Sequence, residues 1–481
     1  MLLAAALAGC DNDAPAGGPL AIDSVRPEPG AVPLEAAAAI RIYFNRALDP
    51  GSVSDSTVTV ILADTNPPAG VLLPAAVTYE PGTRDIRVIA PILPGRAYRV
   101  AVSGAVTDSS RQFQAGPAGW SFASRIWGIQ AADPAATPGT TIALDADADG
   151  VRAAYLDLAY GIARFAECPG ACDVGSWSFG GIDTLGGDFY DLTHDPLGAN
   201  LLTYGTRALV FSTCPASCAL RSSWTRTVVD TSADSTGTLE TWTAVALSPA
   251  GAPRVSYFDA GTGHLRYAEC DSACADSSRW RRLSVDSAGA AGEFTSLSIA
   301  ENGTRHLAYY RPAGASAGVL KYATCASGCD TGAGWDTVTV DGSGDAGFDA
   351  SLSVDGGGRL QVVSYDSASG RVRYAACAAG CTSGLAWTLA DATGGSSPVA
   401  GLAAVADSFG RVHVVYQNSN DELHYLVCAL ACSLSSHWRD VIITGASAWP
   451  LTRPAIALDP SRARLHFFYT DAGTRTPRHV R

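Results

Sequence analysis

A unit of about 50 residues recurs along the chain after Arg125, and this repeat constrains the fold more than any other feature. The copy over residues 243–286 reads TAVALSPAGAPRVSYFDAGTGHLRYAECDSACADSSRWRRLSVD. It contains four short runs rich in apolar residues, joined by turns. Four short strands in a unit of this length are typical of one blade of a β-propeller.

Two recurring sequence features give the number of repeats. An aromatic residue of the second strand appears seven times, at Tyr155, Tyr204, Tyr257, Tyr309, Tyr365, Tyr416 and Tyr469. A cysteine pair followed by a tryptophan appears six times, with Trp177, Trp224, Trp280, Trp335, Trp387 and Trp438. The seventh unit runs to Arg481 with three strands, whereas residues 125–133 match the tryptophan-initiated fourth strand of the other units. We therefore predict a seven-bladed β-propeller over residues 125–481, closed by that early strand so that no sheet edge stays open; six blades is the alternative.

Twelve of the thirteen cysteines form pairs with three residues between the partners. The pairs are Cys168 with Cys172, Cys214 with Cys218, Cys270 with Cys274, Cys325 with Cys329, Cys377 with Cys381, and Cys428 with Cys432. Regular pairing indicates an oxidising compartment. Zinc needs four nitrogen or sulfur ligands, which two cysteines in each separate hairpin do not supply, so we expect six disulfides. Closing so short a loop stabilises a fold by about 2 kcal/mol at most, so these bonds stiffen loops rather than hold the fold together.

The remaining cysteine, Cys10, follows an apolar run, MLLAAALAG, that ends in small residues. Residues 7–10 (LAGC) resemble the lipobox of bacterial lipoproteins, which implies that Cys10 is acylated and becomes the mature N-terminus. The run is short and no Lys or Arg precedes it, so we expect the true start codon to lie upstream; a chance apolar start with a free thiol is the alternative. Residues 1–10 are then signal peptide and lipobox, and residues 11–19 a flexible linker.

Residues 20–124 alternate short apolar runs with turn signals, which predicts a β-sandwich of about seven strands. The expected strands lie within residues 21–30, 39–44, 58–64, 75–82, 85–91, 97–104 and 120–124. The phrases VRPEPG (25–30), IYFNRALD (42–49) and LPGRAY (93–98) resemble bacterial Ig-like domains of the surface-layer type. The resemblance implies a spacer or adhesive module without catalytic residues.

Composition excludes two classes of function. The net charge is -13 and Lys321 is the only lysine, so the chain repels phosphate backbones and nucleic-acid binding is not expected. No stretch reaches the roughly 18 consecutive apolar residues of a membrane-spanning helix, so any membrane contact is expected through a lipid anchor only.

Two hairpins, residues 172–177 (CDVGSW) and 330–335 (DTGAGW), resemble degenerate Asp-boxes, the D-x-G-x-x-W turns of sialidase-type propellers. In that family the box is structural, so the resemblance supports the fold and not the activity. The Arg-Ile-Pro signature and the clustered arginines of sialidases are missing, which argues against sialidase activity.

An acidic turn, Asp145-Ala146-Asp147-Ala148-Asp149-Gly150, resembles calcium loops inserted in some propeller hairpins. Alternate carboxylates before a glycine can wrap a hard cation, so Asp145, Asp147 and Asp149 are candidate calcium ligands. The later ligand positions lack an acid, and an ordinary turn between strands is the favoured interpretation. No other cofactor is expected.

The loops that enter the first strands pair acids with aromatic residues, and in known propellers these loops lie on the ligand-binding face. The candidate ligand-binding residues are Asp188, Phe189, Glu240, Trp242, Glu293, Phe294, Phe348, Asp349 and Trp449. Aromatic faces stack on sugar C–H faces while carboxylates accept hydroxyl hydrogens, so the pattern predicts glycan binding; the alternative is that the aromatic residues only cap each blade. Because similar acids are spread over several blades, we expect repeated weak sites.

The sequence therefore predicts an exported, lipid-anchored, monomeric protein of the bacterial cell envelope, on the periplasmic or the surface-exposed side of the outer membrane. It is expected to bind a glycan or a protein and to have no catalytic residues. The alternative is a sialidase-like glycoside hydrolase or a lyase that uses carboxylates of the same face, two of which would have to lie about 5 to 9.5 Å apart.

Overall fold

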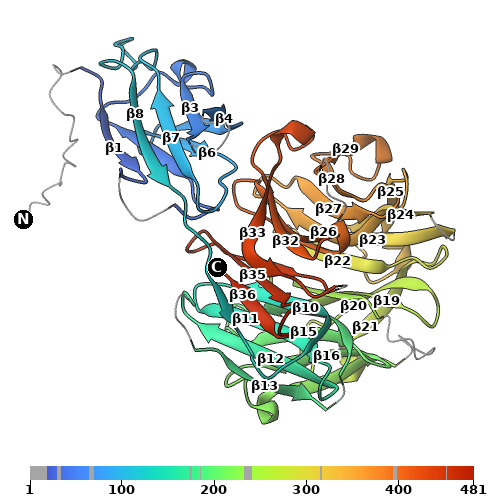
Figure 1. The fold of residues 1–481 in the computed structure, drawn as a ribbon. Helices are drawn as coiled ribbons and strands as arrows, with labels where there is room; N and C mark the ends of the chain where they lie inside the picture. Colours follow the sequence, from blue (N-terminus) through green and yellow to red (C-terminus); the bar gives the residue numbers. More distant parts are fainter. Residues whose placement is uncertain are drawn as a thin grey trace, which may run out of the picture. The chain divides into compact units, whose positions relative to one another are not determined.

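The computed structural model describes residues 19–29, 34–63, 70–172, 176–184, 186–231, 241–314, 317–393, 398–450 and 452–481. In these residues the chain is all-β, and its helices are single 3-10 turns (Figure 1). None of the helices in the described part is long and apolar enough to cross a membrane. Contacts divide the chain into two compact units. The first holds the described residues up to 34 with 39–90 and 95–125; the second holds 35–38, 91–94 and 126–481.

The first unit contains two four-stranded sheets, ordered β1-β2-β6-β5 and β4-β3-β7-β8. Their elements are β1 (Ile22–Arg26), β2 (Ile40–Phe44), η1 (Pro50–Ser52), β3 (Val58–Leu62), β4 (Val71–Leu72), β5 (Ala76–Glu80), β6 (Asp85–Ile89), β7 (Ala97–Val102) and β8 (Ala118–Ala123). All seven expected strands are present, and the two-residue β4 is the one that the sequence did not indicate.

Buried and exposed side chains alternate along strands of this unit such as β7. In β7 the side chains of Tyr98, Val100 and Val102 are buried while the residues between them face outward, so one face of the sheet is apolar. Trp120 of β8 donates its indole N–H to the carbonyl of Pro27, 2.9 Å away, which links the two sheets.

The second unit contains seven four-stranded antiparallel sheets, numbered here 1 to 7 in chain order. Sheet 1 consists of β10 (Pro138–Ala146), β11 (Gly150–Asp157), β12 (Ile162–Pro169) and β13 (Ser178–Asp183). Sheet 2 consists of β14 (Asp188–His194), β15 (Asn200–Gly205), β16 (Leu209–Cys214) and β17 (Thr225–Asp230). Sheet 3 consists of β18 (Thr243–Leu247), β19 (Pro253–Asp259), β20 (His264–Glu269) and β21 (Arg281–Asp286). Sheet 4 consists of β22 (Glu293–Ile299), β23 (Arg305–Gly314), β24 (Ala317–Cys325) and β25 (Asp336–Asp341). Sheet 5 consists of β26 (Ala346–Val354), β27 (Leu360–Asp366), β28 (Arg371–Cys377) and β29 (Thr388–Asp391). Sheet 6 consists of β30 (Pro398–Ala406), β31 (Val412–Asn418), β32 (Glu422–Cys428) and β33 (Arg439–Ser447). Sheet 7 consists of β34 (Ala455–Asp459), β35 (Arg464–Thr470), β36 (Pro477–Val480) and β9 (Ile129–Ala131).

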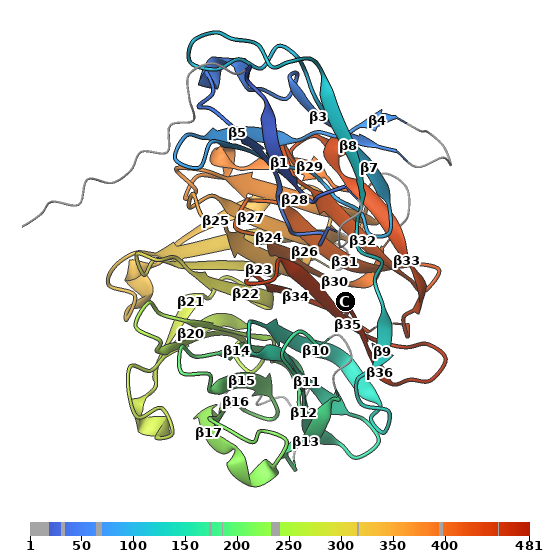
Figure 2. The same cartoon turned by 90° about the vertical axis from the view of Figure 1, so that its left-hand side faces the viewer.

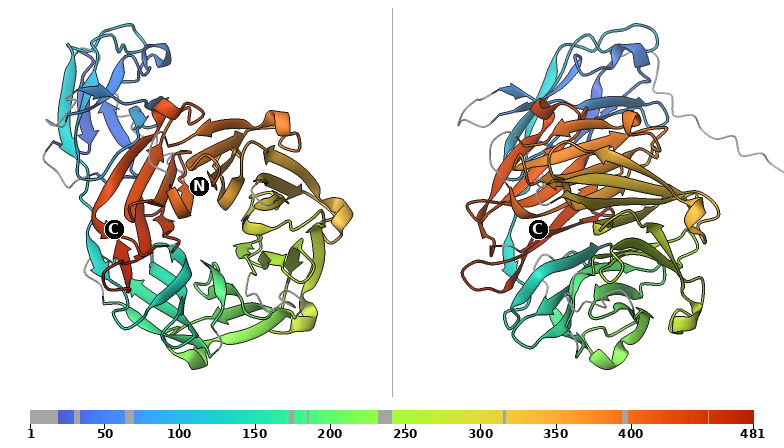
Figure 3. Two further views of the ribbon diagram at one scale, coloured as in Figure 1. Left: turned by 45° about the vertical axis from the view of Figure 1, so that its right-hand side comes forward. Right: turned by 90° about the vertical axis from the view of Figure 1, so that its right-hand side faces the viewer.

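The seven sheets follow one another around a circle, as the left view of Figure 3 shows. The first strand of each sheet contacts the first strand of the next, and β34 of sheet 7 contacts β10 of sheet 1. Figure 2 shows the order within a sheet, with β13 and β17 at the outer edge and β10 and β14 nearer the middle. The first strands therefore line the centre of the ring.

The early strand completes the last sheet, as the sequence predicted. Strand β9 pairs antiparallel with β36, with Ile129 opposite Val480 and Ala131 opposite Arg478. Trp127, just before β9, packs edge-on against Tyr425 and Phe467, with ring centroids 4.8 and 4.7 Å away. Trp127 thus occupies in sheet 7 the place that the hairpin tryptophans occupy in sheets 2 to 6.

Those tryptophans join neighbouring sheets. Each packs on an aromatic ring in the third strand of the preceding sheet: Trp224 on Phe165, Trp280 on Phe211, Trp335 on Tyr267, Trp387 on Tyr322 and Trp438 on Tyr374. Each of these five also donates its indole N–H to the carbonyl of the second cysteine of its hairpin, at 2.8–3.3 Å. A 3-10 turn precedes each of them: η2 (Arg221–Ser223), η3 (Ser277–Arg279), η4 (Gly332–Gly334), η5 (Gly384–Ala386) and η6 (Ser435–His437).

All six predicted disulfides are present, each with its Cα atoms 5.6–5.8 Å apart. The bonds join Cys168 to Cys172, Cys214 to Cys218, Cys270 to Cys274, Cys325 to Cys329, Cys377 to Cys381, and Cys428 to Cys432. These cysteines therefore hold no metal, and the six disulfides indicate an extracellular or envelope protein. Within the described residues no group of three or more His, Cys, Asp or Glu side chains could hold a metal ion.

The repeat tyrosines also join neighbouring sheets, through their hydroxyl groups. In four sheets the hydroxyl donates to an aspartate at the end of the preceding sheet's outer strand: Tyr155 to Asp133 (2.9 Å), Tyr204 to Asp183 (2.9 Å), Tyr257 to Asp230 (2.5 Å) and Tyr309 to Asp286 (2.7 Å). A basic side chain pairs with each of these carboxylates: Arg164, Arg226, Arg266 and Lys321 in that order. The buried hydroxyls are thus satisfied by charge-assisted hydrogen bonds that fix the spacing of the sheets.

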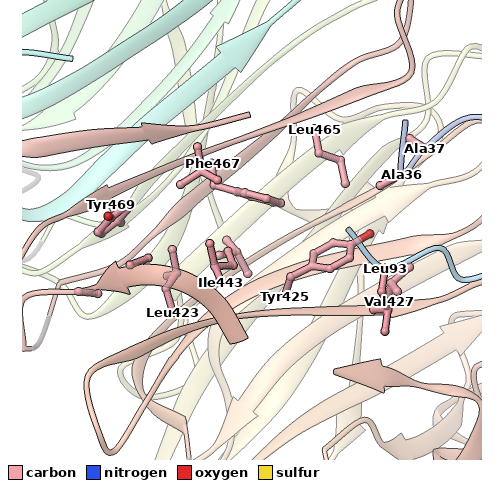
Figure 4. Close-up of a cluster of buried hydrophobic side chains, with 14 residues drawn as sticks. Ala36, Ala37, Leu93, Leu423, Tyr425, Val427, Ile443, Leu465, Phe467 and Tyr469 are labelled. Carbon is pink, nitrogen blue, oxygen red and sulfur yellow. The ribbon is translucent and has the colours of Figure 1, made fainter. Parts of the chain in front are cut away.

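Figure 4 shows an apolar cluster of the second unit, where sheets 6 and 7 meet. Tyr425 and Phe467 lie in it with ring centroids 5.8 Å apart. Leu93 and the pair Ala36 and Ala37, from the short segments that belong to this unit, also join the cluster. The closing sheet is therefore anchored by apolar packing as well as by its strand pairing.

Candidate functional site

A cavity of about 210 Å³ opens where the first strands converge at the centre of the ring. Residues from all seven sheets line it, including Thr141 of sheet 1, Leu402 of sheet 6 and Ile456 of sheet 7. Arg453 contacts four other lining side chains, and we call the five residues the axial cluster: Phe189, Trp242, Phe294, Asp349 and Arg453.

The local backbone conformation directs three of these side chains toward the cavity. Phe189, Phe294 and Asp349 have φ angles of 59°, 52° and 50°, which non-glycine residues rarely adopt. In each case the pairing of the first strand with the second shifts register beside the residue, as at a β-bulge. A bulge re-aims a side chain, and strained backbone of this kind costs about 1–3 kcal/mol where it occurs. The same distortion in three sheets turns equivalent side chains toward one place.

The three aromatic rings of the axial cluster form a continuous stack. The centroid of Trp242 lies 3.6 Å from that of Phe189 and 3.9 Å from that of Phe294, with interplanar angles of 37° and 39°. Phe348 extends the stack behind Phe294, at 5.0 Å. The cavity thus has one wall of aromatic surface.

Arg453 lies over this wall. Its guanidinium carbon is 4.7 Å from the centroid of Trp242, 5.1 Å from that of Phe294 and 5.9 Å from that of Phe189. Its Nε donates to Oδ1 of Asp349 at 2.5 Å, and the Asp349 carboxylate is almost fully buried. Asp349 also accepts a hydrogen bond from the backbone N–H of Leu402, at 3.2 Å. Cation–π contact and a hydrogen-bonded carboxylate together fix the orientation of the guanidinium.

Two further carboxyl groups lie beside the axial cluster. Burial raises the pKa of Asp188, although the hydroxyl of Thr140 donates to it and the charge of Arg453 favours its ionised form. Burial raises the pKa of Asp191, which lines the cavity, to about 7. This happens even though the N–H of Val245 donates to Asp191 at 2.7 Å, because loss of hydration outweighs the hydrogen bond.

The structure brings together four of the nine predicted ligand-binding residues in the cavity wall: Phe189, Trp242, Phe294 and Asp349. Asp188 and Phe348 are adjacent to them, and Glu293 begins β22 opposite Tyr310. Trp449 lies apart, on the segment between β33 and β34, under the guanidinium of Arg475 at 4.0 Å. Glu240 lies outside the described residues.

The sequence predicted repeated weak sites, whereas the structure places four of the predicted side chains, from different sheets, in the wall of one cavity. The sequence reasoning also missed Arg453 and Asp191. Arg453 lies just before the first strand of the seventh repeat, and Trp242 lies just before the first strand of the third repeat. An alignment of the repeats would therefore have placed Arg453 at the same position as Trp242.

The predicted calcium ligands are engaged with cations of the chain itself. Arg152 lies 3.4 Å from Asp145 and 3.1 Å from Asp147, and the two nitrogens of His194 lie 2.6 and 3.0 Å from the same two carboxylates. These acids raise the pKa of His194, chiefly through the hydrogen bond to Asp145. Asp149 is exposed on the turn. Calcium binding at this turn stays a prediction.

Comparison with known proteins gives a family for the N-terminal part. Residues 16–124 match the family described as a bacterial Ig-like domain, which agrees with the resemblance seen in the sequence. No curated protein matches the chain.

Among solved structures, a lectin from Burkholderia pseudomallei is 15% identical, with a TM-score of 0.48, and the match covers 70% of this chain and 97% of the lectin. The Aleuria aurantia lectin, solved with Fucα1-6GlcNAc, is 14% identical, with a TM-score of 0.40 and coverages of 70% and 91%. A polysaccharide lyase described as an ulvan lyase is 9% identical, with a TM-score of 0.48 and coverages of 72% and 93%.

Proposed function

We propose that this chain is an exported, lipid-anchored and monomeric protein whose Ig-like domain carries a seven-bladed β-propeller that binds a glycan in its central cavity. The seven four-stranded sheets, the contact of β34 with β10 and the completion of sheet 7 by β9 support the propeller.

The observation that carries the proposal is the convergence of the axial cluster on one cavity. Sugar rings present apolar C–H faces that stack on aromatic rings, and hydroxyl groups that pair with charged or polar side chains. The wall formed by Phe189, Trp242 and Phe294 offers the first kind of contact, and Asp349, Asp191 and Arg453 offer the second. The cavity is smaller than the roughly 300–1,000 Å³ usual for drug-sized ligands, which suits one sugar residue at the end or on a branch of a chain.

A glycan array with two aromatic variants tests the proposal. Trp242→Ala removes the middle ring of the stack, and we expect it to weaken binding of the captured glycan about 2- to 10-fold, since a ring contact is worth about 0.5–1.5 kcal/mol. Trp242→Phe keeps a ring and should retain most of the affinity. Tyr160→Ala, which removes an aromatic ring 69% exposed on the same unit, is the control and should leave binding unchanged.

Two outcomes would contradict the proposal. A folded wild-type protein that captures no glycan on the array removes the glycan as ligand. Mass spectrometry of the captured glycan after incubation tests the hydrolase or lyase alternative, and shortened products would show that the protein is an enzyme. Melting curves of each variant establish that a loss of binding is not a loss of fold.

The lipid anchor rests on residues 7–10 and on the cysteine count, because Cys10 is the one cysteine outside the six disulfides. Cys10 lies outside the described residues. We expect the protein expressed in a bacterium with its natural leader to partition into detergent and to incorporate labelled fatty acid, and Cys10→Ala to abolish both. A wild-type protein recovered without fatty acid would contradict the anchor.

A further inference from the structure

We infer that the central cavity selects an acidic sugar, whose carboxylate or sulfate group binds the two terminal nitrogens of Arg453. This inference rests on the proposed glycan binding and names the class of glycan.

The first support is the hydrogen bonding of Arg453. Its Nε is used by Asp349, and its backbone N–H donates to the carbonyl of Thr140 at 2.7 Å. Among the residues that the structure describes, no oxygen atom accepts a hydrogen bond from either terminal nitrogen. The side chain is 20% exposed at a cavity, so its open edge can reach a ligand.

The second support is the environment of the guanidinium. Three aromatic rings cover it and exclude water from that side, so an anion at the open edge interacts with a poorly hydrated cation. A fixed, planar guanidinium presents two parallel N–H groups that match the two oxygens of a carboxylate or sulfate. Lysine at the same place would offer a point charge without this match.

The third support is the balance of charge around the cavity. Asp349 neutralises one edge of Arg453 and is itself bonded to the N–H of Leu402, so it is not available to repel a ligand strongly. Asp191 is held partly in its neutral form near pH 7 because burial raises its pKa. The charge of Arg453 also favours the ionised form of Asp188, whose carboxylate accepts a hydrogen bond from the hydroxyl of Thr140. Among the described residues that line the cavity, Arg453 is thus the one cation, with its Nε paired with Asp349 and its terminal nitrogens left for a ligand.

Calorimetric titration of the full chain with oligogalacturonate and oligoglucuronate, each compared with its carboxyl-reduced counterpart and with a sulfated neutral oligosaccharide, tests the inference. We expect an acidic member to bind about 10-fold or more tightly than its neutral counterpart, the usual value of a hydrogen bond to a charged group. Arg453→Gln should remove this preference and Arg453→Lys should restore part of it. Arg475→Gln, which removes the guanidinium stacked on Trp449 outside the cavity, should change nothing.

Because Arg453→Gln leaves Asp349 without its partner, the double variant Arg453→Gln/Asp349→Asn, with a neutral pair, repeats the measurement in case the single variant does not fold. Equal affinity for acidic and neutral sugars, unchanged in these variants, would overturn the acidic class and leave glycan binding intact. Preference for the sulfated sugar that depends on Arg453 would support the anion site. Absence of binding to every sugar tested, together with an empty glycan array, would remove the proposed function itself.

Discussion

Tyr309 shows what a repeat tyrosine does besides filling the core. Its hydroxyl is buried between sheets 3 and 4 and donates to Asp286, which also pairs with Lys321. The same arrangement of tyrosine, aspartate and base recurs at three other junctions. The sequence repeat therefore encodes a polar contact between sheets as well as an apolar core.

Removing that hydroxyl should loosen one junction. We expect Tyr309→Phe to lower the free energy of unfolding by about 1–3 kcal/mol, because the buried carboxylate of Asp286 loses a donor while the ring stays in place. Urea titration followed by tryptophan fluorescence measures this loss. Tyr160→Phe removes a hydroxyl from an exposed tyrosine and should shift the midpoint little. Equal midpoints for the two variants would mean that the hydroxyl contributes nothing.

Asp191 should make stability depend on pH. Burial raises its pKa in the folded protein to about 7, whereas an exposed aspartate has a pKa of about 3.9. As the pH rises from about 4 to about 7, the unfolded chain loses this proton before the folded protein does, so stability falls across that window. Asp191→Asn removes the effect, and its stability relative to the wild type should rise by up to about 1.4 kcal/mol per pH unit between those limits and stay level outside them.

Chemical denaturation at half-unit steps from pH 3 to 8 measures that difference. Asp336→Asn, at an exposed position on β25, is the matched control. A constant difference between Asp191→Asn and the wild type at all pH values would show that Asp191 ionises in the folded protein as it does in the unfolded chain.

At the scale of elements, the hairpins between third and fourth strands are of two kinds. In sheets 1 to 6 a disulfide with a sequence separation of 4 closes the hairpin, which stabilises it by about 2 kcal/mol at most. In sheet 7 the fourth strand is β9, which comes from the other end of the ring sequence and has no such bond to β36. Three residue pairs, the packing of Trp127 and Ile129, and a hydrogen bond between Gln130 and His479 hold this strand.

Trp127 should therefore control the closure of the ring. We expect Trp127→Ala to cost about 3 kcal/mol, because the side chain leaves its contacts with Tyr425 and Phe467. Hydrogen exchange should accelerate first in β9 and β36, since Trp127 lies directly before β9 and no disulfide joins these two strands. Ile126→Ala, which removes a side chain 77% exposed next to Trp127, is the control. Unchanged exchange in β9 of Trp127→Ala would show that strand pairing alone closes the ring.

At the scale of the whole second unit, the ring creates the site. Phe189 and Arg453 are more than half of the chain apart in sequence, yet they line one cavity because each precedes or begins a first strand. A cavity made in this way at the centre of the ring has one copy per ring, whatever the number of repeats. Acids and aromatic residues that are spread over the sequence therefore meet in the wall of this cavity.

The cysteine spacing, the tryptophans and the repeat tyrosines were enough to predict the sheets, the six disulfides and the strand pairing of β9. They suffice because strands, hairpins and short disulfides depend on residues close in sequence, and because Trp127 repeats a local pattern. The calcium prediction for Asp145 and Asp147 could not include His194, which lies in the next sheet and bonds to both carboxylates.

The sequence by itself thus determined the local units of this protein and their number, since their contacts are encoded within each repeat of about 50 residues. Only the tertiary structure decided which side chains meet at the centre. Curving seven sheets into a ring brings one position of each first strand to a common axis. There the orientation of Arg453, the burial of Asp349 and the raised pKa of Asp191 arise from neighbours in other sheets.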